Sequence, residues 1–191
     1  MTDPATMESM RTDPAPSDQA VRFRHAGVED IPALVTLVTS AYRGDVSRQG
    51  WTTEADILDG NRIDPEVLRE DIERPRSAVL IAERGDALLA CAHVCDEEGL
   101  GYFGMFAVRP DLQNAGIGRL VLAEAERLAR EQWSLTTMCM TVIDLRSELI
   151  AWYERRGYRR TGVKKPFPAT DPRFGLPLRD DLRFEVLEKP L

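Results

Sequence analysis

A glycine-bearing turn at residues 113–118 has the residue types that bind a phosphate group. Its sequence is Gln113-Asn114-Ala115-Gly116-Ile117-Gly118, and it joins an apolar, strand-like run to an amphipathic helical pattern. Gly116 and Gly118 lack the Cβ atoms that would block the close approach of an anion. The free N–H groups of a first helical turn, with the positive end of the helix dipole behind them, bind such an anion. The turn is therefore predicted to hold a phosphorylated ligand.

Three kinds of glycine-rich loop are possible at this position, and the spacing of their characteristic residues distinguishes them. A dinucleotide fingerprint requires glycine or alanine where Val121 stands. A Walker A loop requires lysine followed by serine or threonine after its last glycine, where this chain has Arg119 and Leu120. The pattern that remains is Gln-x-x-Gly-x-Gly after a strand that ends in Val-Arg-Pro.

The elements that position this turn alternate between strands and helices. Apolar runs and apolar alternation predict strands over residues 21–24, 77–83, 87–94, 101–108, 135–143, 158–163 and 182–187. Helical spacing and start signals predict helices over residues 30–42, 64–75 and 147–156, and one that starts at 118. Strands interleaved with helices indicate an α/β or α+β sheet with helices on its faces.

The turn and a second segment resemble the signatures of the GNAT superfamily of N-acetyltransferases. Members of this family bind acetyl-coenzyme A (acetyl-CoA) with an Arg/Gln-x-x-Gly-x-Gly/Ala turn after the fourth strand, which residues 113–118 match. The second signature is a helix that carries a tyrosine and closes on glycine and an aromatic residue. It is similar to the run Ala151-Trp152-Tyr153-Glu154-Arg155-Arg156-Gly157-Tyr158. The two segments stand in the family order, and the order of elements matches over residues 21–187.

The resemblance implies a mixed, mostly antiparallel central sheet of about six to seven strands flanked by about four helices. It also implies acetyl-CoA as the co-substrate. Backbone groups of Met105, Phe106 and Val108 would hydrogen-bond the pantetheine arm, with an N–H near Phe106 facing the thioester oxygen. The residues that would hold the pyrophosphate are Gln113, Asn114, Ala115, Gly116, Ile117, Gly118 and Arg119. Many family members carry asparagine seven residues before the tyrosine, where this chain has Arg146.

Tyr153 is the candidate general acid that the resemblance indicates. Acetyl transfer to an amine requires a proton for the departing thiolate, and a phenol with an ordinary pKa of about 10 is protonated at neutral pH. Core packing is the alternative, because Tyr153 lies beside Trp152 in an apolar helix. Both roles are open on the sequence alone.

Glu54 and Asp56 are the candidate general bases. They stand close to Trp51, and an aromatic wall with carboxylates can receive a cationic amine. Solvent-exposed or helix-capping roles are the alternative. Phe167, in the proline-rich connection 164–177, is a second candidate for the acceptor wall, because long ordered loops tend to be functional. The alternative for this connection is a surface excursion stiffened by prolines.

The composition restricts the class of partner. The chain has 191 residues and a formal net charge of −7, which argues against a nucleic-acid partner. No run is long and apolar enough to span a membrane, and no signal-peptide core is present, so a cytoplasmic location is expected. The histidines and cysteines lack metal-site spacing, so no metal is expected. Residues 1–20 are expected to form a flexible leader, and residues 21–191 one N-acetyltransferase domain.

Taken with the resemblance, these observations predict an acetyl-CoA-dependent N-acetyltransferase. It would act on a primary amine of a small molecule or peptide, by direct attack in a ternary complex. The alternative is an acyl-CoA-binding sensor or interaction module without transfer activity. A nucleotide-binding oxidoreductase is disfavoured by Val121. Because family members are often dimers, a homodimer is a further expectation of the resemblance.

Overall fold

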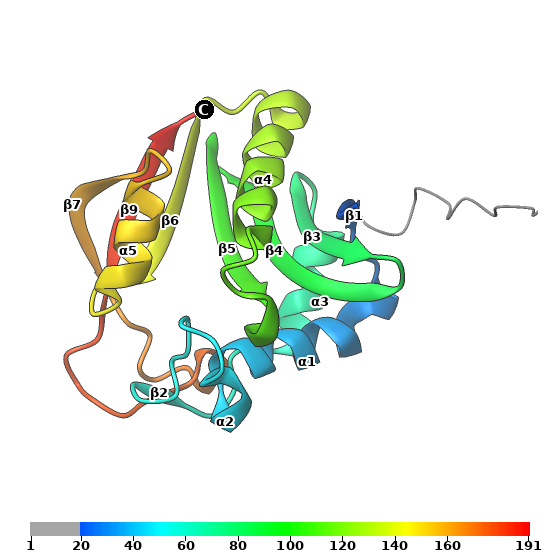
Figure 1. Cartoon of the computed structure of the whole chain (residues 1–191). Helices are drawn as coiled ribbons and strands as arrows, with labels where there is room; N and C mark the ends of the chain where they lie inside the picture. Colours follow the sequence, from blue (N-terminus) through cyan, green and yellow to red (C-terminus); the bar gives the residue numbers. More distant parts are fainter. Residues whose placement is uncertain (1–19) are drawn as a thin grey trace, which may run out of the picture.

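Seven strands form one mixed sheet in the computed structural model, which describes residues 20–191 (Figure 1). In sheet order they are β1 (Arg22–His25), β3 (Ser77–Arg84), β4 (Ala87–Glu97), β5 (Leu100–Val108), β6 (Thr137–Ile143), β9 (Arg183–Pro190) and β7 (Arg159–Pro166). Neighbouring strands pair antiparallel, except β5 and β6, which are parallel. The expected mostly antiparallel sheet is therefore confirmed. The expected leader lies outside the described residues, apart from residue 20.

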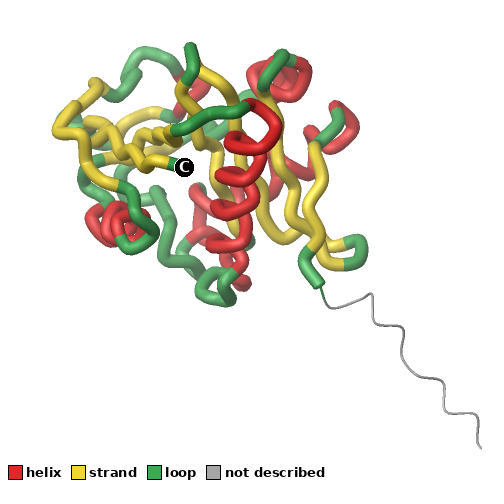
Figure 2. Tube along the Cα trace, turned by 90° about the horizontal axis from the view of Figure 1, so that it is seen from above, coloured by secondary structure: helices red, strands yellow, loops and turns green. Residues whose placement is uncertain are grey.

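Helices cover both faces of the sheet, as Figure 2 shows. Over residues 20–191 the α-helices are α1 (Ile31–Tyr42), α2 (Gly44–Ser47), α3 (Pro65–Glu73), α4 (Ile117–Trp133) and α5 (Ser147–Glu154). The core clusters place α1 and α3 on one face and α4 and α5 on the other. The one-turn α2 was not expected, because Gly44 is more typical of a helix end. None of these helices is long and apolar enough to cross a membrane.

Alternate residues of β3 enter two separate hydrophobic clusters. Ala78, Leu80 and Ala82 join the cluster that contains α4 and α5, whereas Val79 and Ile81 join the one that contains α1 and α3. Successive side chains of a strand point to opposite faces of a sheet. A continuous apolar run therefore indicates a strand that is buried on both sides. The core consists of two layers with the sheet between them.

The strands β5 and β6 separate soon after they begin. Their parallel pairing is limited to Gly101 with Met138 and Tyr102 with Cys139. Beyond these pairs the two strands diverge toward their carboxyl ends (Figure 1). The sheet is therefore open at this point, and the helix α4 starts close to the opening.

A β-bulge interrupts β5 beside the opening. The register with β4 shifts between Cys91 and His93, so that Met105 and Phe106 stand opposite a single residue of β4. Met105 has a φ of +44°, which is unusual for a residue with a side chain. The Phe106 carbonyl accepts a hydrogen bond from the Tyr42 hydroxyl at the end of α1. The bulge takes backbone groups out of the β4 ladder and turns them toward the opening.

Two connecting segments meet in a second, two-stranded sheet. β2 (Leu58–Asp59) pairs with β8 (Leu176–Pro177), close to the open end of the main sheet (Figure 1). Gly175 packs against this junction with a φ of +101°, and an added Cβ would lie 2.8 Å from Nη2 of Arg43. Neither strand was expected, because two residues show no alternation in the sequence.

Gly175→Ala tests whether this junction needs a glycine. Positive φ alone costs roughly 1 to 2 kcal/mol for a residue with a Cβ. We expect a larger loss here, because the Cβ would also meet the backbone oxygens of Asp59 and Asn61 at 3.0 and 3.1 Å. Gly162→Ala is the matched control, since Gly162 has a φ of +81° and open space around it. Equal losses of unfolding free energy in chemical denaturation would contradict this account of Gly175.

Candidate active site

Three adjoining cavities, of about 200, 100 and 380 Å³, lie along the opening between β5 and β6. We call them the turn cavity, at the start of α4, the sheet cavity, between β5 and β6, and the α3 cavity, beside α3. Tyr42, Phe106 and Leu149 line both the turn cavity and the sheet cavity. Gly104 and Met105 line both the sheet cavity and the α3 cavity. The row of cavities therefore extends from one face of the sheet to the other.

The two positions of the turn are glycine for different structural reasons. Gly116 is the N-cap residue of α4 with a φ of +82°, and an added Cβ would meet nothing within 4 Å. Gly118 is required by close packing, because its Cβ would lie 3.1 Å from Cζ of Phe106. Ala115 is exposed, and the Ile117 side chain is buried in the core, so the turn presents backbone groups at both positions. Val108, Gln113, Asn114, Gly116, Gly118 and Arg119 line the turn cavity.

The Gln113 side chain is engaged within the protein. Its Oε1 accepts a hydrogen bond from the Trp51 N–H at 2.9 Å. Its Nε2 donates to Oγ1 of Thr52 at 2.8 Å and to the Val108 carbonyl at 3.3 Å. An added Cβ on Gly50 would lie 2.6 Å from Oε1 of Gln113. The amide thus fastens this segment over the end of β5 and places Trp51 on the wall of the turn cavity.

Arg156 is a cationic wall residue that sequence reasoning missed. Its guanidinium stacks 3.5 Å from the centroid of the Trp152 ring, and its Nη1 donates to the Trp152 carbonyl. Burial, and then the charges of Arg155 and Arg119, lower the pKa of Arg156. Two arginines beside a helix N-terminus favour a bound anion. The adjacent pair Arg155-Arg156 was the available signal, but it does not tell which of the two turns inward.

Tyr153 combines core packing with a place on a cavity wall. Its ring makes edge contacts with Phe103, Trp152 and Tyr158. It also lines the sheet cavity together with Phe106. Burial raises the pKa of the Tyr153 hydroxyl well above its ordinary value, so the group is protonated at neutral pH. The hydroxyl has no hydrogen-bond partner in the part of the chain that the structure describes.

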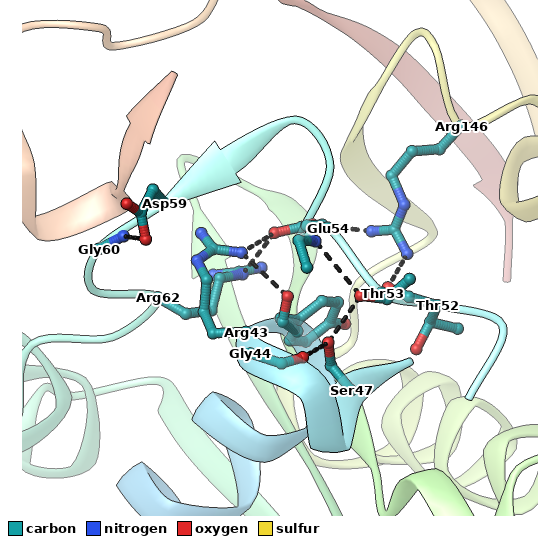
Figure 3. Close-up of polar contacts among 12 residues, drawn as sticks. Arg43, Gly44, Ser47, Thr52, Thr53, Glu54, Asp59, Gly60, Arg62 and Arg146 are labelled. Atoms are coloured by element: carbon teal, nitrogen blue, oxygen red, sulfur yellow. Dashed lines mark hydrogen bonds and ion pairs between the residues drawn. The ribbon is translucent and has the colours of Figure 1, made fainter. Parts of the chain in front are cut away.

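Glu54 is the centre of a buried charge cluster, shown in Figure 3. Its side chain is 4% exposed, and its two oxygens accept hydrogen bonds from Arg43 and Arg146, each at 2.8 Å. Nε of Arg62 lies 3.4 Å from the same carboxylate. Burial alone would raise the pKa of Glu54. The charges of Arg62, Arg146 and Arg43 outweigh burial and leave that pKa below its ordinary value.

These surroundings disfavour both candidate bases. A carboxylate held by three guanidinium groups is a weak proton acceptor, which argues against Glu54. The side chain of Asp56 is 72% exposed and pairs with Arg48 at 2.9 Å, outside the walls of the three cavities. Arg146, which replaces the usual asparagine, also donates to the Thr52 carbonyl at 2.6 Å. It therefore fastens the segment around Glu54.

Glu54→Gln is expected to destabilise the fold by about 3 to 5 kcal/mol, because it leaves buried guanidinium groups without a counter-charge. The pKa of Glu54 in the folded protein lies below its ordinary value of 4.5. Its contribution to stability is therefore complete above pH 4.5 and is lost as the pH falls below that value. Urea unfolding at acidic and neutral pH measures both effects. Asp56→Asn is the matched control, expected to change little; equal losses would contradict the role of Glu54.

Asp71 and His93 face the α3 cavity from α3 and β4. Nε2 of His93 lies 2.8 Å from Oγ of Ser77, and Nδ1 lies 3.6 Å from Oδ2 of Asp71. Burial, aided by the charge of Arg74, lowers the pKa of His93 to about 4. Burial raises the pKa of Asp71 to about 6. This wall therefore holds a neutral imidazole beside a carboxyl group that titrates close to neutral pH.

Phe167 lies on the wall of the sheet cavity. Its ring packs against Phe184 of β9, with the two centroids 5.4 Å apart. Both rings pack on the small hydrophobic cluster of Leu58, Ile143 and Leu182. The connection after β7 thus contributes an aromatic wall next to the opening of the sheet.

Comparison with known proteins shows a similarity to acetyltransferases. Residues 75–160 match the family model of the acetyltransferase (GNAT) domain. Ribosomal-protein-alanine N-acetyltransferase from Brucella melitensis superposes with a TM-score of 0.65 at 23% identity, covering 89% of this chain and 99% of that one. Ribosomal-protein-S18-alanine N-acetyltransferase from Escherichia coli gives 0.64 at 17% identity, over 90% and 94% of the two chains. No curated protein sequence matches the chain significantly.

A third solved structure is that of PaiA N-acetyltransferase from Thermoplasma acidophilum in complex with coenzyme A. Its TM-score is 0.63 at 15% identity, over 91% of this chain and 100% of that one. The matched residues 75–160 include the β5 bulge, the glycine turn and α5. Residues 75–160 thus match the acetyltransferase (GNAT) family model, and the chain shares the fold of these solved N-acetyltransferase structures.

Proposed function

We propose that this protein transfers the acetyl group of acetyl-CoA to a primary amine of a small molecule or peptide, by direct attack in a ternary complex. The observation that carries the proposal is the row of three cavities through the open sheet. The turn cavity and the α3 cavity both adjoin the sheet cavity, so two molecules can meet there from opposite faces. Such positioning suits direct transfer between bound reactants.

The turn cavity supplies the groups that a pyrophosphate requires. The N–H groups of the first turn of α4 have no partner within the helix, and Gly116 leaves open space beside them. Arg119 and Arg156 line the same cavity and add positive charge. The other residues of the proposed pyrophosphate site are Gln113, Asn114, Ala115, Ile117 and Gly118. Gln113 contributes through its backbone, because its side chain is already engaged.

The bulge of β5 supplies the groups for the thioester end of the donor. Met105 and Phe106 are out of register with β4, so their backbone is available to the pantetheine arm together with that of Val108. In the proposal the Phe106 N–H faces the thioester oxygen. A donor fixed at that oxygen stabilises the negative charge that develops there during attack.

Tyr153 is the proposed general acid. The acceptor nitrogen forms a bond to the acetyl carbon, the C–S bond breaks, and Tyr153 donates its hydroxyl proton to the leaving thiolate. The nitrogen loses a proton in the same reaction, so the products are an amide and free coenzyme A. The place of Tyr153 beside Phe106 on the wall of the sheet cavity supports this role. Its raised pKa ensures that a proton is present to donate.

Asp71 is the proposed proton acceptor for the amine. It lines the α3 cavity with Met105, next to the bulge. Burial raises the pKa of Asp71 to about 6, the charge of Arg74 opposes this rise, and the charges of Glu70 and Glu97 add to it. A base that titrates close to the working pH is efficient. The proposal therefore uses neither of the candidate bases from the sequence.

An assay of thiol release tests the proposed reaction. Acetyl-CoA is mixed with a panel of primary amines, and free coenzyme A is measured. Tyr153→Phe is expected to lower kcat about 100-fold or more, with little change in acetyl-CoA affinity, because only proton donation is lost. Tyr158→Phe is the matched control, since the Tyr158 hydroxyl donates to Glu126 outside the cavities.

Two outcomes of this assay contradict the proposal. Full turnover by Tyr153→Phe excludes that hydroxyl as the acid. Thermal stabilisation by acetyl-CoA without thiol release from any amine favours the alternative, a module that binds acyl-CoA without transferring its acetyl group.

The pH dependence of kcat/KM tests Asp71. A base must be deprotonated, so kcat/KM is expected to fall about tenfold per pH unit below about 6, the pKa of Asp71. Asp71→Asn is expected to lower kcat/KM at neutral pH and to remove this acidic limb. Glu70→Gln should keep the activity and shift the limb to lower pH, because the charge of Glu70 helps to raise the pKa of Asp71. An unchanged profile in Asp71→Asn would exclude Asp71.

We also propose a cytoplasmic location, a homodimer, and action without a metal ion or a nucleic-acid partner. These proposals rest on the sequence and the family resemblance. The net charge of −7 supports the last of them.

A further inference from the structure

Arg62 lies on the walls of two of the three cavities. It lies in the segment between β2 and α3, and its side chain is 25% exposed. Its guanidinium carbon is 4.7 Å from the centroid of the Tyr42 ring. The side chain lines both the sheet cavity and the α3 cavity. Figure 3 shows the same guanidinium beside Glu54.

The guanidinium of Arg62 has unused hydrogen-bond donors. Its ion-pair partner is Glu54, whose Oε2 lies 3.4 Å from Nε, and this Nε is buried without a hydrogen bond in the described part of the chain. Arg43 and Arg146 already donate to the same carboxylate at 2.8 Å. Buried donors without a partner are unfavourable. The Arg62 side chain also lines two cavities, and its guanidinium makes no hydrogen bond within the described residues, so it can bind a ligand with acceptor atoms there.

The charge of the cluster also favours an anion. Three guanidinium groups and one carboxylate leave a net charge of three minus one, or +2, around Glu54. Burial alone would lower the pKa of Arg62, but the charge of Glu54 opposes it and the pKa remains above its ordinary value. Arg62 is therefore charged. A partly buried cation with an incomplete counter-charge is stabilised by a bound anion.

We propose that Arg62 binds a carboxylate of the acceptor, so that the acceptors are amino acids and related amines with a carboxylate close to the reacting nitrogen. This inference rests on the proposed acetyl transfer, because it concerns the acceptor of that reaction. A planar guanidinium binds a carboxylate through two parallel N–H···O hydrogen bonds. The site is thus matched in shape as well as in charge.

The position of Tyr42 sets the spacing between the carboxylate and the reacting nitrogen. Arg62 lies over the Tyr42 ring, and the hydroxyl of that ring donates to the Phe106 carbonyl at the bulge. Arg62 and the proposed point of transfer therefore contact the same tyrosine side chain. This shared contact favours acceptors whose amine and carboxylate are near neighbours.

The α3 cavity favours a carboxylate over a phosphate group. Its wall carries charges of both signs: the carboxyl groups of Asp64, Asp71 and Glu97, and the guanidinium groups of Arg62, Arg74 and Arg173. The carboxyl groups attract the positive nitrogen of the acceptor and repel a dianionic phosphate more strongly than a singly charged carboxylate. A zwitterionic amine matches both parts of this wall.

The test compares three forms of the same acceptor: the amino acid, its carboxamide and the decarboxylated amine. For each form, kcat/KM is measured by thiol release with the wild type, Arg62→Gln and Arg62→Lys. Arg62→Gln is expected to lower kcat/KM at least about tenfold more for the amino acid than for the decarboxylated amine, mainly through KM. For each acceptor, the kcat/KM of the wild type is divided by that of the variant. This ratio cancels the effect of the different basicities of the amines. Arg62→Lys should restore part of the preference.

Controls separate this role from a structural one. Arg48→Gln, at an exposed arginine outside the three cavities, should leave the preference unchanged. Thermal unfolding shows whether each Arg62 variant is folded. Equal losses for all three acceptors in Arg62→Gln would overturn the inference, because they would reflect a disturbed charge cluster. A phosphonate analogue with a higher kcat/KM than the amino acid would show that the site prefers a phosphate-like group to a carboxylate. That result would also overturn the inference.

Calorimetric titration makes the inference independent of turnover. The protein is saturated with coenzyme A and titrated with the amino acid or with its decarboxylated amine. Tighter binding of the amino acid, lost in Arg62→Gln, supports the carboxylate site even if no thiol is released and the proposed transfer fails. Transfer to amines without any preference for the carboxylate form overturns the inference while the proposed reaction stands.

Discussion

The buried carboxylate of Glu54 connects three segments that are far apart in the sequence. Arg43 follows α1, Arg62 precedes α3 and Arg146 stands at the start of α5. Removing one member of such a cluster leaves buried charge, which costs more free energy than the pairing itself contributes. The cluster thus fixes the loops around the open end of the sheet. The walls of the cavities depend on a carboxylate that takes no part in the proposed chemistry.

Because β5 and β6 pair over a short length, the sheet has an opening, and the cavities along it extend from one face of the sheet to the other. The two strands share only two residue pairs, and the bulge at Met105 then turns the backbone of β5 toward the gap. The α4 helix follows β5 after a short turn, so its N-terminus lies near the carboxyl ends of the separated strands. Anions favour helix N-termini, and ligands of open sheets favour strand ends. The position of the proposed donor site thus results from the direct connection of β5 to α4.

The sequence-based predictions agreed with the structure where they rested on residues that are close together in the chain. The glycine turn and the strand β3 could be predicted, because they rest on neighbouring residues in the sequence. β2 and β8 were missed, because each has two residues and is held by pairing with the other. Glu54 was singled out as a base for its charge and its neighbour Trp51. Its three arginine partners, which change that interpretation, come from other segments.

The sequence by itself determined the order of the main strands and helices, the fold class and the turn expected to hold the donor. Hydrophobic period and glycine placement act within a few residues, so they can be read along the chain. Only the tertiary structure decided which carboxyl group is saturated by arginines and which one, Asp71, faces a cavity with a raised pKa. It also decided that Arg62 lines two cavities while its Nε is buried without a hydrogen bond within the described residues. The physical reason is that burial and charge pairing depend on groups brought together from distant segments.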